Sequence, residues 1–377
     1  MKSKFYLLTI SVMSLMLISC NGGNGKSLSS LDVSSSEVIS SVEPITTSEE
    51  PFKFNYWSEG SEVLAKLVNY VEDVTNKDSE NYIPAEDRIA TFDMDGTFYG
   101  ELFPTYLEYW FLKYRGLEDP TYEAPEDVRE AAQNIKDFYE NKIPSLPSGF
   151  ELIHANMQAK AFAGMTVKEF DSYVKNFLKF NVEGFENLTF GNAFYKPMLE
   201  VFDYLEENDF TYYVVSGSDR YICKALVCDS LGIPTNRVIG MDVELRGSKQ
   251  DSSVENVNYT FTKDEDLIRG DKMMIKDLKM NKVMNIYQEI GKKPVLSFGN
   301  SSGDQAMHNY CLSNENYKTE VFMLIADDYD EDHANPTETN KRKAKWIENN
   351  YNIISMHDDF TTIYGEDVIK TKFSWEE

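Results

Sequence analysis

The chain has 377 residues, which allows two domains at roughly 150 residues per domain. Hydrophobic residues make up 42% of the chain and aromatic residues 13%, which is ample for a packed core. The net charge of −26 argues against a nucleic-acid partner, because the phosphates would be repelled. It says little about a small phosphorylated ligand, because local charge at the pocket decides that interaction.

Residues 1–20 have the pattern of a targeting segment. Lys2 and Lys4 precede an apolar run over residues 5–18, which is too short for a comfortable membrane span. The run ends in Leu-Ile-Ser-Cys20, which resembles the bacterial lipobox; an ordinary signal peptide with a chance cysteine is the alternative. The resemblance implies a lipoprotein signal peptide that is removed and a lipidated Cys20 that anchors the protein, outside the cytoplasm, to a bacterial membrane.

Residues 21–51 are rich in Ser, Gly, Thr and Glu and contain no aromatic residue. Such a segment cannot bury enough apolar surface to fold, so we expect a flexible tether. The globular part should begin directly after it, with an amphipathic helix over residues 61–74. The other cysteines are Cys223, Cys228 and Cys311, and they show no zinc-binding spacing. We expect them to be buried apolar residues, although export would make a disulfide chemically possible.

Two carboxylates follow an apolar, β-prone run at residues 88–93. The run predicts a buried strand, and Gly96 allows the chain to turn sharply just beyond it. In a parallel α/β sheet, ligands lie beyond the carboxyl ends of the strands. Asp93 and Asp95 are therefore expected to converge on one point, where one can attack or bind a metal and the other can move protons.

The segment Asp93-Met-Asp95-Gly-Thr after an apolar strand resembles the first motif of haloacid dehalogenase (HAD) superfamily phosphatases. The resemblance implies that Asp93 is the nucleophile that becomes aspartyl-phosphate. It also implies that Asp95 is the general acid/base, and that its backbone carbonyl helps to hold Mg²⁺. Taken alone, Asp-Gly is also an ordinary turn dipeptide, so the later motifs are needed to decide.

Residues 101–205 separate this motif from the next and are expected to be mostly helical. Helices are predicted over residues 103–114, 126–139, 167–178 and 197–207. The placement resembles the helical cap that many HAD phosphatases insert after the first motif, which implies a domain that closes over the site and selects the substrate. The aromatic residues at its start could cage a cationic group, but packing is favoured: Tyr99, Phe103, Tyr106, Tyr109 and Trp110.

A second β-rich run, residues 212–215, ends in Ser216-Gly217-Ser218. It resembles the second HAD motif, which implies that the Ser216 hydroxyl binds the transferring phosphoryl group. Backbone N–H groups after it, with Gly217 among the phosphate-binding residues, could add to anion binding. No G-x-S-x-G surrounds Ser216, so a serine-hydrolase nucleophile is not expected. A β-hairpin is predicted over residues 243–261.

The third HAD motif is one basic residue near a helix start, and several lysines compete for it. Lys282 is favoured because it opens an apolar helical pattern that leads into a predicted strand over residues 294–298. Lys279 is the next candidate, followed by Lys272 and Lys276. A lysine suits the role because a compact ammonium can neutralise the nucleophile and the phosphoryl group together.

The segment Gly299-Asn300-Ser-Ser-Gly-Asp304 follows that strand and resembles the fourth motif, in the form found in a phosphoserine-phosphatase-like branch. Many members have an acid where this chain has Asn300. The resemblance implies that Asp93, the carbonyl of Asp95, Asn300 and Asp304 organise Mg²⁺, with Asp304 acting directly or through water. An amide oxygen still suits Mg²⁺, which prefers oxygen ligands and keeps several waters.

Two more strands, over residues 321–326 and 352–356, and a helix over residues 341–349 are predicted near the end of the chain. The expected fold is α/β. Residues 52–100 and 206–377 would form a Rossmann-like parallel sheet core of the HAD type, and residues 101–205 would form the helical cap domain inserted after the first motif.

The expected function is Mg²⁺-dependent hydrolysis of a small phosphomonoester, a phosphorylated metabolite, through an aspartyl-phosphate intermediate. Phosphocholine or phosphoserine phosphatase activity is the alternative within the family. The alternative from another class is a non-catalytic lipoprotein that binds phosphorylated ligands or partners. The intact Asp93, Asp95 and Asp304 argue for turnover.

Overall fold

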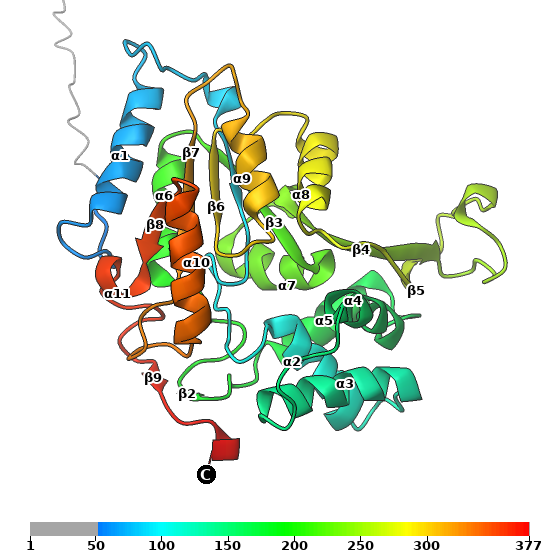
Figure 1. Ribbon diagram of the computed structural model, residues 1–377. Coiled ribbons are helices and arrows are strands. Elements are labelled where there is room, and N and C mark those ends of the chain that lie inside the picture. Colours follow the sequence, from blue (N-terminus) through cyan, green and yellow to red (C-terminus); the bar gives the residue numbers. More distant parts are fainter. Residues whose placement is uncertain (1–51, 377) are drawn as a thin grey trace, which may run out of the picture. The chain divides into compact units, whose positions relative to one another are not determined.

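A seven-stranded sheet runs through the part of the chain that this computed structural model describes, residues 52–376 (Figure 1). Its strands are β1 Ile89–Phe92, β3 Thr211–Asp219, β4 Val238–Gly247, β5 Leu267–Ile275, β6 Leu296–Gly299, β7 Glu320–Ile325 and β8 Asn352–Ser355. The order is β5-β4-β3-β1-β6-β7-β8, and all neighbours are parallel except β4 and β5. The predicted signal peptide with Cys20 and the predicted tether lie outside the described residues.

Helices pack on both faces of the sheet. They are α1 Glu62–Thr75, α6 Lys196–Glu207, α7 Arg220–Leu231, α8 Met280–Asn285, α9 Gln305–Leu312, α10 Pro336–Glu348 and α11 Met356–Asp359. On one face Phe92 stacks on Phe298 with ring centres 4.2 Å apart and meets Phe202 of α6 at 4.6 Å. On the other face Met323 and Trp346 of α10 belong to a separate buried cluster. The predicted α/β class with a Rossmann-like parallel sheet is confirmed.

Between β1 and β3 the chain forms a layer of helices beyond the end of the sheet (Figure 1). These cap helices are α2 Leu107–Lys113, α3 Glu126–Tyr139, α4 Phe150–Ala161 and α5 Val167–Phe177. Aromatic rings fill their interior: Phe111 stacks on Phe162 at 4.7 Å, and Phe170 meets Phe162 at 5.0 Å. Helix α6 instead packs on the sheet, where Phe202 stacks on Tyr212 at 4.6 Å. The domain boundaries drawn from the sequence remain predictions.

Three elements differ from the sequence-based expectations. Helix α4 is not foreseen, because its exposed Leu152 and Ile153 blur the apolar periodicity that marks a helix. The hairpin expected over residues 243–261 pairs β4 with β5 instead, so the polar turn extends over residues 248–266. Helix α10 begins earlier than expected, because the Asn335 side chain accepts hydrogen bonds from the first-turn N–H groups.

The β4–β5 hairpin is tied to the cap through Arg269. Its N–H donates to the Met165 carbonyl and its carbonyl accepts from the Gly164 N–H, both at 2.8 Å. Its guanidinium pairs with Asp219 at 2.6 Å, with both side chains fully buried, and lies 3.7 Å from the centre of the Phe170 ring. One arginine therefore joins the end of β3, the hairpin and the cap.

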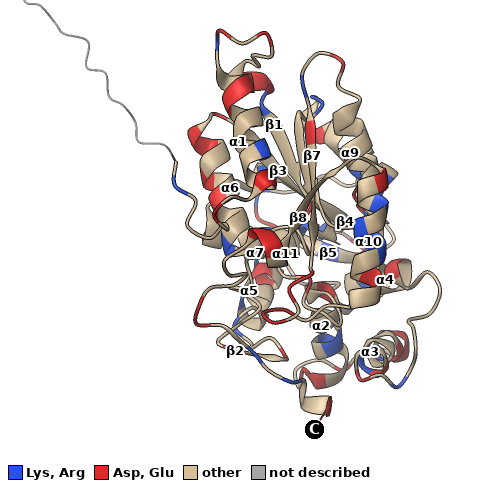
Figure 2. Cartoon of the chain, turned by 60° about the vertical axis from the view of Figure 1, so that its left-hand side comes forward, with Lys and Arg blue, Asp and Glu red and all other residues tan. Residues whose placement is uncertain are grey.

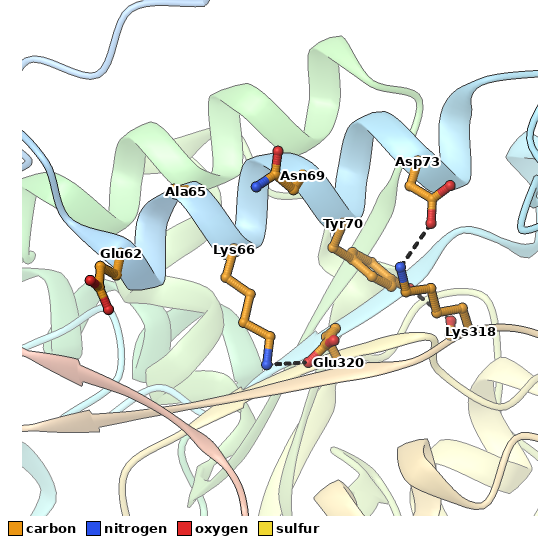
Figure 3. A pocket seen from close by; sticks show the side chains of 8 residues that line it. All are labelled: Glu62, Ala65, Lys66, Asn69, Tyr70, Asp73, Lys318 and Glu320. Carbon is orange, nitrogen blue, oxygen red and sulfur yellow. Dashed lines mark hydrogen bonds and ion pairs between the residues drawn. The ribbon is translucent and has the colours of Figure 1, made fainter.

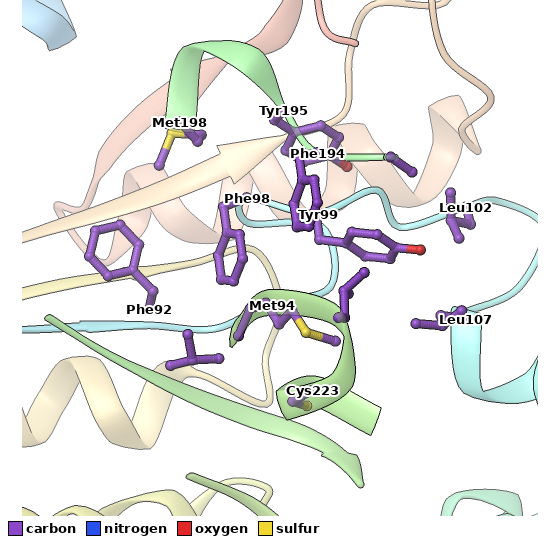
Figure 4. Close-up of a cluster of buried hydrophobic side chains, with 14 of the residues drawn as sticks. Phe92, Met94, Phe98, Tyr99, Leu102, Leu107, Phe194, Tyr195, Met198 and Cys223 are labelled. Carbon is purple, nitrogen blue, oxygen red and sulfur yellow. The ribbon is translucent and has the colours of Figure 1, made fainter. Parts of the chain in front are cut away.

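Two of the five aromatic residues that follow the first motif, Tyr99 and Trp110, pack into the core. Tyr99 is fully buried beside Phe194 (Figure 4). The Tyr99 hydroxyl donates to the Phe190 carbonyl at 2.7 Å. Trp110 is buried against Tyr139, with ring centres 4.6 Å apart. The packing interpretation is therefore confirmed for Tyr99 and Trp110.

Within residues 52–376, no helix combines the length and the apolar composition that crossing a bilayer requires. The cysteines in this part of the chain are free rather than paired. Cys223 and Cys311 are buried, as expected, and Cys228 is half-buried.

Candidate active site

The sheet register brings the predicted motifs together at one edge. Phe92, the last residue of β1, pairs with Val214 of β3 on one side and with Phe298 of β6 on the other. Residues that follow these three positions therefore emerge side by side at the carboxyl ends of the strands. Those residues are Asp93, Asp95, Ser216, Gly217, Asn300 and Asp304. This is the part of a parallel α/β sheet where ligands bind.

Gly96 makes the turn after β1 possible in two ways. Its φ of 78° lies in the left-handed region, which residues with a Cβ rarely adopt. A Cβ at this position would also lie 1.9 Å from Nδ2 of Asn300, so only glycine lets the Asn300 amide pack against the turn. The Gly96 N–H donates to the Tyr99 carbonyl at 2.7 Å and closes the turn. The first and fourth motifs thus meet across a single glycine.

Lys282 of α8 contacts the first and fourth motifs directly. Its Nζ lies 2.6 Å from Oδ1 of Asp93 and 2.7 Å from Oδ1 of Asp304, and its side chain is fully buried. A buried ammonium between two carboxylates is held by both charges. Lys279, the next candidate from the sequence, is exposed and lies on the rim of the cavity.

Asp93 is buried, and one of its oxygens is free of strong partners. Oδ1 accepts from Lys282, while Oδ2 has only the Thr97 hydroxyl at 3.5 Å. Burial and the negative charge of Asp304 raise the pKa of Asp93 to about 7, against the opposing effect of Lys282. A cation or a transferring phosphoryl group near Oδ2 fits this arrangement, because the ionised form then gains a partner.

Asp95 is suited to hold a proton. Burial raises its pKa to about 8, and the charges of Asp93 and Glu108 act in the same direction. The Ser218 hydroxyl donates to its Oδ2 at 2.8 Å, while its Oδ1 is buried without a hydrogen-bond partner. A carboxyl group that keeps its proton near neutral pH can act as a general acid. The two aspartates differ in their partners, because Asp93 contacts the Lys282 ammonium and Asp95 accepts from a neutral hydroxyl.

Asp304 holds the loop after β6 in place. Its Oδ2 accepts from the N–H groups of Asn300 and Ser301, at 3.2 and 2.9 Å, and from the Ser301 hydroxyl at 3.0 Å. Its Oδ1 accepts from Lys282. Both oxygens are therefore engaged within the protein, which fixes the Asp304 side chain in one orientation.

The residues around Asp93 offer oxygen atoms, the type of ligand that Mg²⁺ prefers. Asp93, Asp95 and Asn300 line one cavity and carry carboxylate, carbonyl and amide oxygens, and Mg²⁺ is commonly held by one or two carboxylates and several waters. Within residues 52–376 no three His, Cys, Asp or Glu side chains are gathered as a ready-made metal site. The oxygen set thus suits a partly hydrated Mg²⁺ better than a metal enclosed by the protein.

Ser216 lies deeper than the sequence predicts. It is fully buried, and its Oγ accepts a hydrogen bond from the Ser218 N–H at 3.1 Å. Gly217 and Ser218, rather than Ser216, line the cavity. A Cβ at Gly217 would lie 2.7 Å from Cδ2 of Leu278, so this position also allows two segments to approach closely.

Sequence reasoning missed a cap contribution to the site. Glu108 of α2 accepts from the Asp219 N–H at 2.5 Å and pairs with Lys276 at 3.3 Å. It also raises the pKa of Asp95, which Lys276 opposes. No local motif marks Glu108, because its partners lie more than a hundred residues away along the chain.

A cavity of about 650 Å³ opens in front of the two aspartates. The strand-end loops line one side of it, and α10 forms a further wall. The cap contributes Tyr106, which precedes α2, Tyr109 of α2 and Leu152 of α4. Tyr106 and Tyr109 are thus the two of the early aromatic residues that face a ligand space. A second hollow of about 520 Å³ lies between α1 and the start of β7, where Lys66 pairs with Glu320 and Lys318 with Asp73 (Figure 3).

No protein-family model matches the chain, and no curated protein sequence is similar to it. Among solved structures, it is similar to a conserved protein of unknown function from Anaerococcus prevotii, with 16% identity, 81% of this chain and 94% of that one covered, and a TM-score of 0.48. It is similar to cytosolic 5′-nucleotidase IIIB bound to cytidine, with 12% identity, coverages of 72% and 80%, and a TM-score of 0.44. A phosphoserine phosphohydrolase-like protein from Francisella tularensis is 12% identical, with coverages of 63% and 87% and a TM-score of 0.34.

Proposed function

We propose that the chain is a Mg²⁺-dependent phosphomonoesterase of the HAD type that acts on a small phosphorylated metabolite. The observation that carries the proposal is the pairing of two unlike carboxyl groups at the end of β1. Asp93 contacts the buried Lys282 ammonium at 2.6 Å and has an oxygen without a strong partner, whereas Asp95 accepts from the Ser218 hydroxyl at 2.8 Å and burial raises its pKa to about 8. A nucleophile and an acid placed side by side are what acyl-phosphate chemistry requires.

In the first half of the proposed reaction, an Asp93 oxygen attacks phosphorus. The new Asp–O–P bond forms as the ester P–O bond breaks, and Asp95 donates its proton to the departing alkoxide. In the second half, Asp95 takes a proton from a water molecule that attacks phosphorus, which releases phosphate and restores Asp93. A bound Mg²⁺ would supply charge neutralisation at the phosphoryl oxygens.

Lys282 has a positioning role and an electrostatic one in this scheme. Its ammonium holds Asp93 and Asp304 together and neutralises charge that develops on the phosphoryl group. Gly217 lies at the cavity wall, where its backbone can approach the phosphoryl oxygens without a side chain in the way. Ser216 supports this turn through its bond with the Ser218 N–H.

Asp95→Asn should separate the two halves of the reaction. With p-nitrophenyl phosphate and Mg²⁺, the good leaving group needs little protonation, so phosphoenzyme should form. Its hydrolysis should slow by about 10²–10⁴-fold, the usual contribution of a general acid/base. Intact-mass measurement after a rapid acid quench should show one added phosphoryl group.

The matched control is Asp332→Asn. Asp332 is also a buried carboxyl group, with a pKa raised by burial to about 7, but it bonds to Tyr364 and does not line the cavity. Turnover of this variant should stay within about twofold of wild type. Phosphate found on Ser216, or wild-type turnover by Asp95→Asn, would contradict the mechanism. Binding of phosphoesters without any turnover would favour the non-catalytic alternative.

We also propose that Cys20 anchors the mature protein to a bacterial membrane, outside the cytoplasm. The support is the apolar run that ends in Leu-Ile-Ser-Cys20 and the polar segment over residues 21–51 that follows it. Cys20→Ala should leave the precursor unprocessed, or release the protein from the membrane fraction. A wild-type protein that is found soluble, with residues 1–19 still attached, would contradict the proposal.

A further inference from the structure

Helix α10 presents a row of basic side chains to the cavity. Lys341, Arg342 and Lys345 all line it, and their spacing of three and four residues places them on one side of the helix. The chain as a whole is strongly acidic, with 63 Asp and Glu against 37 Lys and Arg. Figure 2 shows several blue positions along α10. The concentration of cations at this wall therefore runs against the overall charge of the protein.

The members of this row differ in how firmly they are paired. Arg342 contacts both carboxylate oxygens of Glu101, at 3.1 and 3.2 Å. Lys341 lies 3.6 Å from Glu338, and with side chains 75% and 53% exposed this contact contributes little. Lys345 lies 5.1 Å from the centre of the Trp346 ring, and within residues 52–376 it has no carboxylate at ion-pair distance.

The neighbouring Lys343 serves as a comparison, because it lies on the same helix but outside the basic row. It pairs with Asp327 at 3.2 Å and does not line the cavity. The general preference of helix ends for basic residues would account for a lysine near the C-terminus of α10. This preference does not explain why Lys341, Arg342 and Lys345 all line one cavity, whereas Lys343, on another side of the helix, is paired with a carboxylate.

The cations of the reaction centre are already committed. Lys282 is held by Asp93 and Asp304, and Lys276 pairs with Glu108. Of the four lysines that line the cavity, Lys276 is paired with a buried carboxylate, whereas Lys279 on the rim and the two lysines of α10 are exposed toward a ligand. Two like charges that face the same space repel each other, and an anion placed between them removes this repulsion.

We infer that the substrate carries a second anionic group, a carboxylate or a second phosphate, which Lys341 and Lys345 of α10 bind. The inference rests on the proposed phosphatase function, because it places the phosphoryl group to be removed at Asp93. Glu151 of α4 lines the cavity without a lysine or arginine as a neighbour on its own helix, whereas Glu338 in the first turn of α10 lies 3.6 Å from Lys341, so the second anion belongs beside Lys341 and Lys345. Among the alternatives within the family, a substrate with a cationic group such as phosphocholine is disfavoured.

The test compares three esters with the same three-carbon frame: glycerol 3-phosphate, 3-phosphoglycerate and glycerol 1,3-bisphosphate. The wild type should prefer at least one of the two esters that carry a second anion. The double variant Lys341→Gln/Lys345→Gln should lower kcat/KM for that ester by about tenfold or more, mainly through KM. Turnover of glycerol 3-phosphate should change by less than about twofold, and Lys343→Gln should change neither. Whichever ester shows the loss identifies the second anion as carboxylate or phosphate.

Calorimetric binding of the same esters to the Asp93→Asn variant, with and without the two glutamine substitutions, keeps the two proposals separate. One outcome is that the wild type turns over no phosphoester, while a doubly anionic ester still binds more tightly and this binding requires Lys341 and Lys345. That outcome would overturn the phosphatase function alone. Equal turnover and equal binding of all three esters would overturn the second-anion inference alone. Equal losses for all three esters in the double variant would also overturn it, because the lysines would then act without regard to the second charge.

Discussion

Replacing Asp93 with asparagine should reduce turnover of every phosphoester by more than about 10⁴-fold. The amide has nearly the same shape, but it is a poor nucleophile, so no covalent phosphoenzyme should form. The variant should still fold, because Lys282 keeps its contact with Asp304 at 2.7 Å. Steady-state kinetics with p-nitrophenyl phosphate and Mg²⁺, together with intact-mass measurement after acid quench, would check both expectations.

The comparison with Asp95→Asn makes this result specific. Both variants convert a buried carboxyl group at the end of β1 into an amide, yet only Asp95→Asn should accumulate phosphoenzyme. If both variants accumulate phosphoenzyme, or neither does, Asp93 and Asp95 do not have separate roles as nucleophile and general acid/base. Turnover by Asp93→Asn close to that of the wild type would exclude Asp93 as the nucleophile.

Replacing Lys282 with methionine should impair both stability and activity. The side chain keeps a similar length but loses the charge, so Asp93 and Asp304 would face each other across a buried space without a counter-ion. Breaking a buried pair in this way typically costs about 3–5 kcal/mol of folding free energy. Loss of the ammonium should also lower kcat by about 10²–10³-fold. Chemical denaturation and steady-state kinetics would measure the two effects.

Lys272→Met is the matched control for that experiment. Lys272 also competes for the third motif in the sequence, but it lies exposed on β5 and away from the cavity. Its replacement should change stability by no more than about 0.5 kcal/mol. A large loss of activity in Lys279→Met, with Lys282→Met active, would transfer the third motif to Lys279.

The residues with local signals could be predicted from the sequence, and the structure brings most of them together. Asp93, Asp95, Asn300 and Asp304 each follow an apolar strand within a short motif, and strand ends in a parallel sheet share one edge. The favoured position of Lys282 came from the helical pattern that it opens. Its contacts with Asp93 and Asp304 then depend on how α8 packs, which no spacing along the chain encodes.

The parts that the sequence did not predict depend on contacts between distant segments. Glu108 acts at the site only because α2 of the cap meets the end of β3, and nothing near it in the chain marks that contact. Helix α4 presents Leu152 to the cavity and Ile153 to solvent, and so lacks the one-sided pattern of a helix on a core. The basic residues of α10 are visible in the sequence, but only the fold shows that they line the same cavity as the two aspartates.

The connection made by Arg269 has a consequence for how a ligand is received. Because this buried side chain and its backbone fasten the hairpin, the end of β3 and the cap to one another, the walls that the cap contributes to the cavity are held in place when the chain folds. A ligand then meets a preorganised receptor, and the loss of conformational entropy that ordering these walls requires falls on folding instead of on binding. Selectivity in such a receptor depends on the shape and charge that are already present.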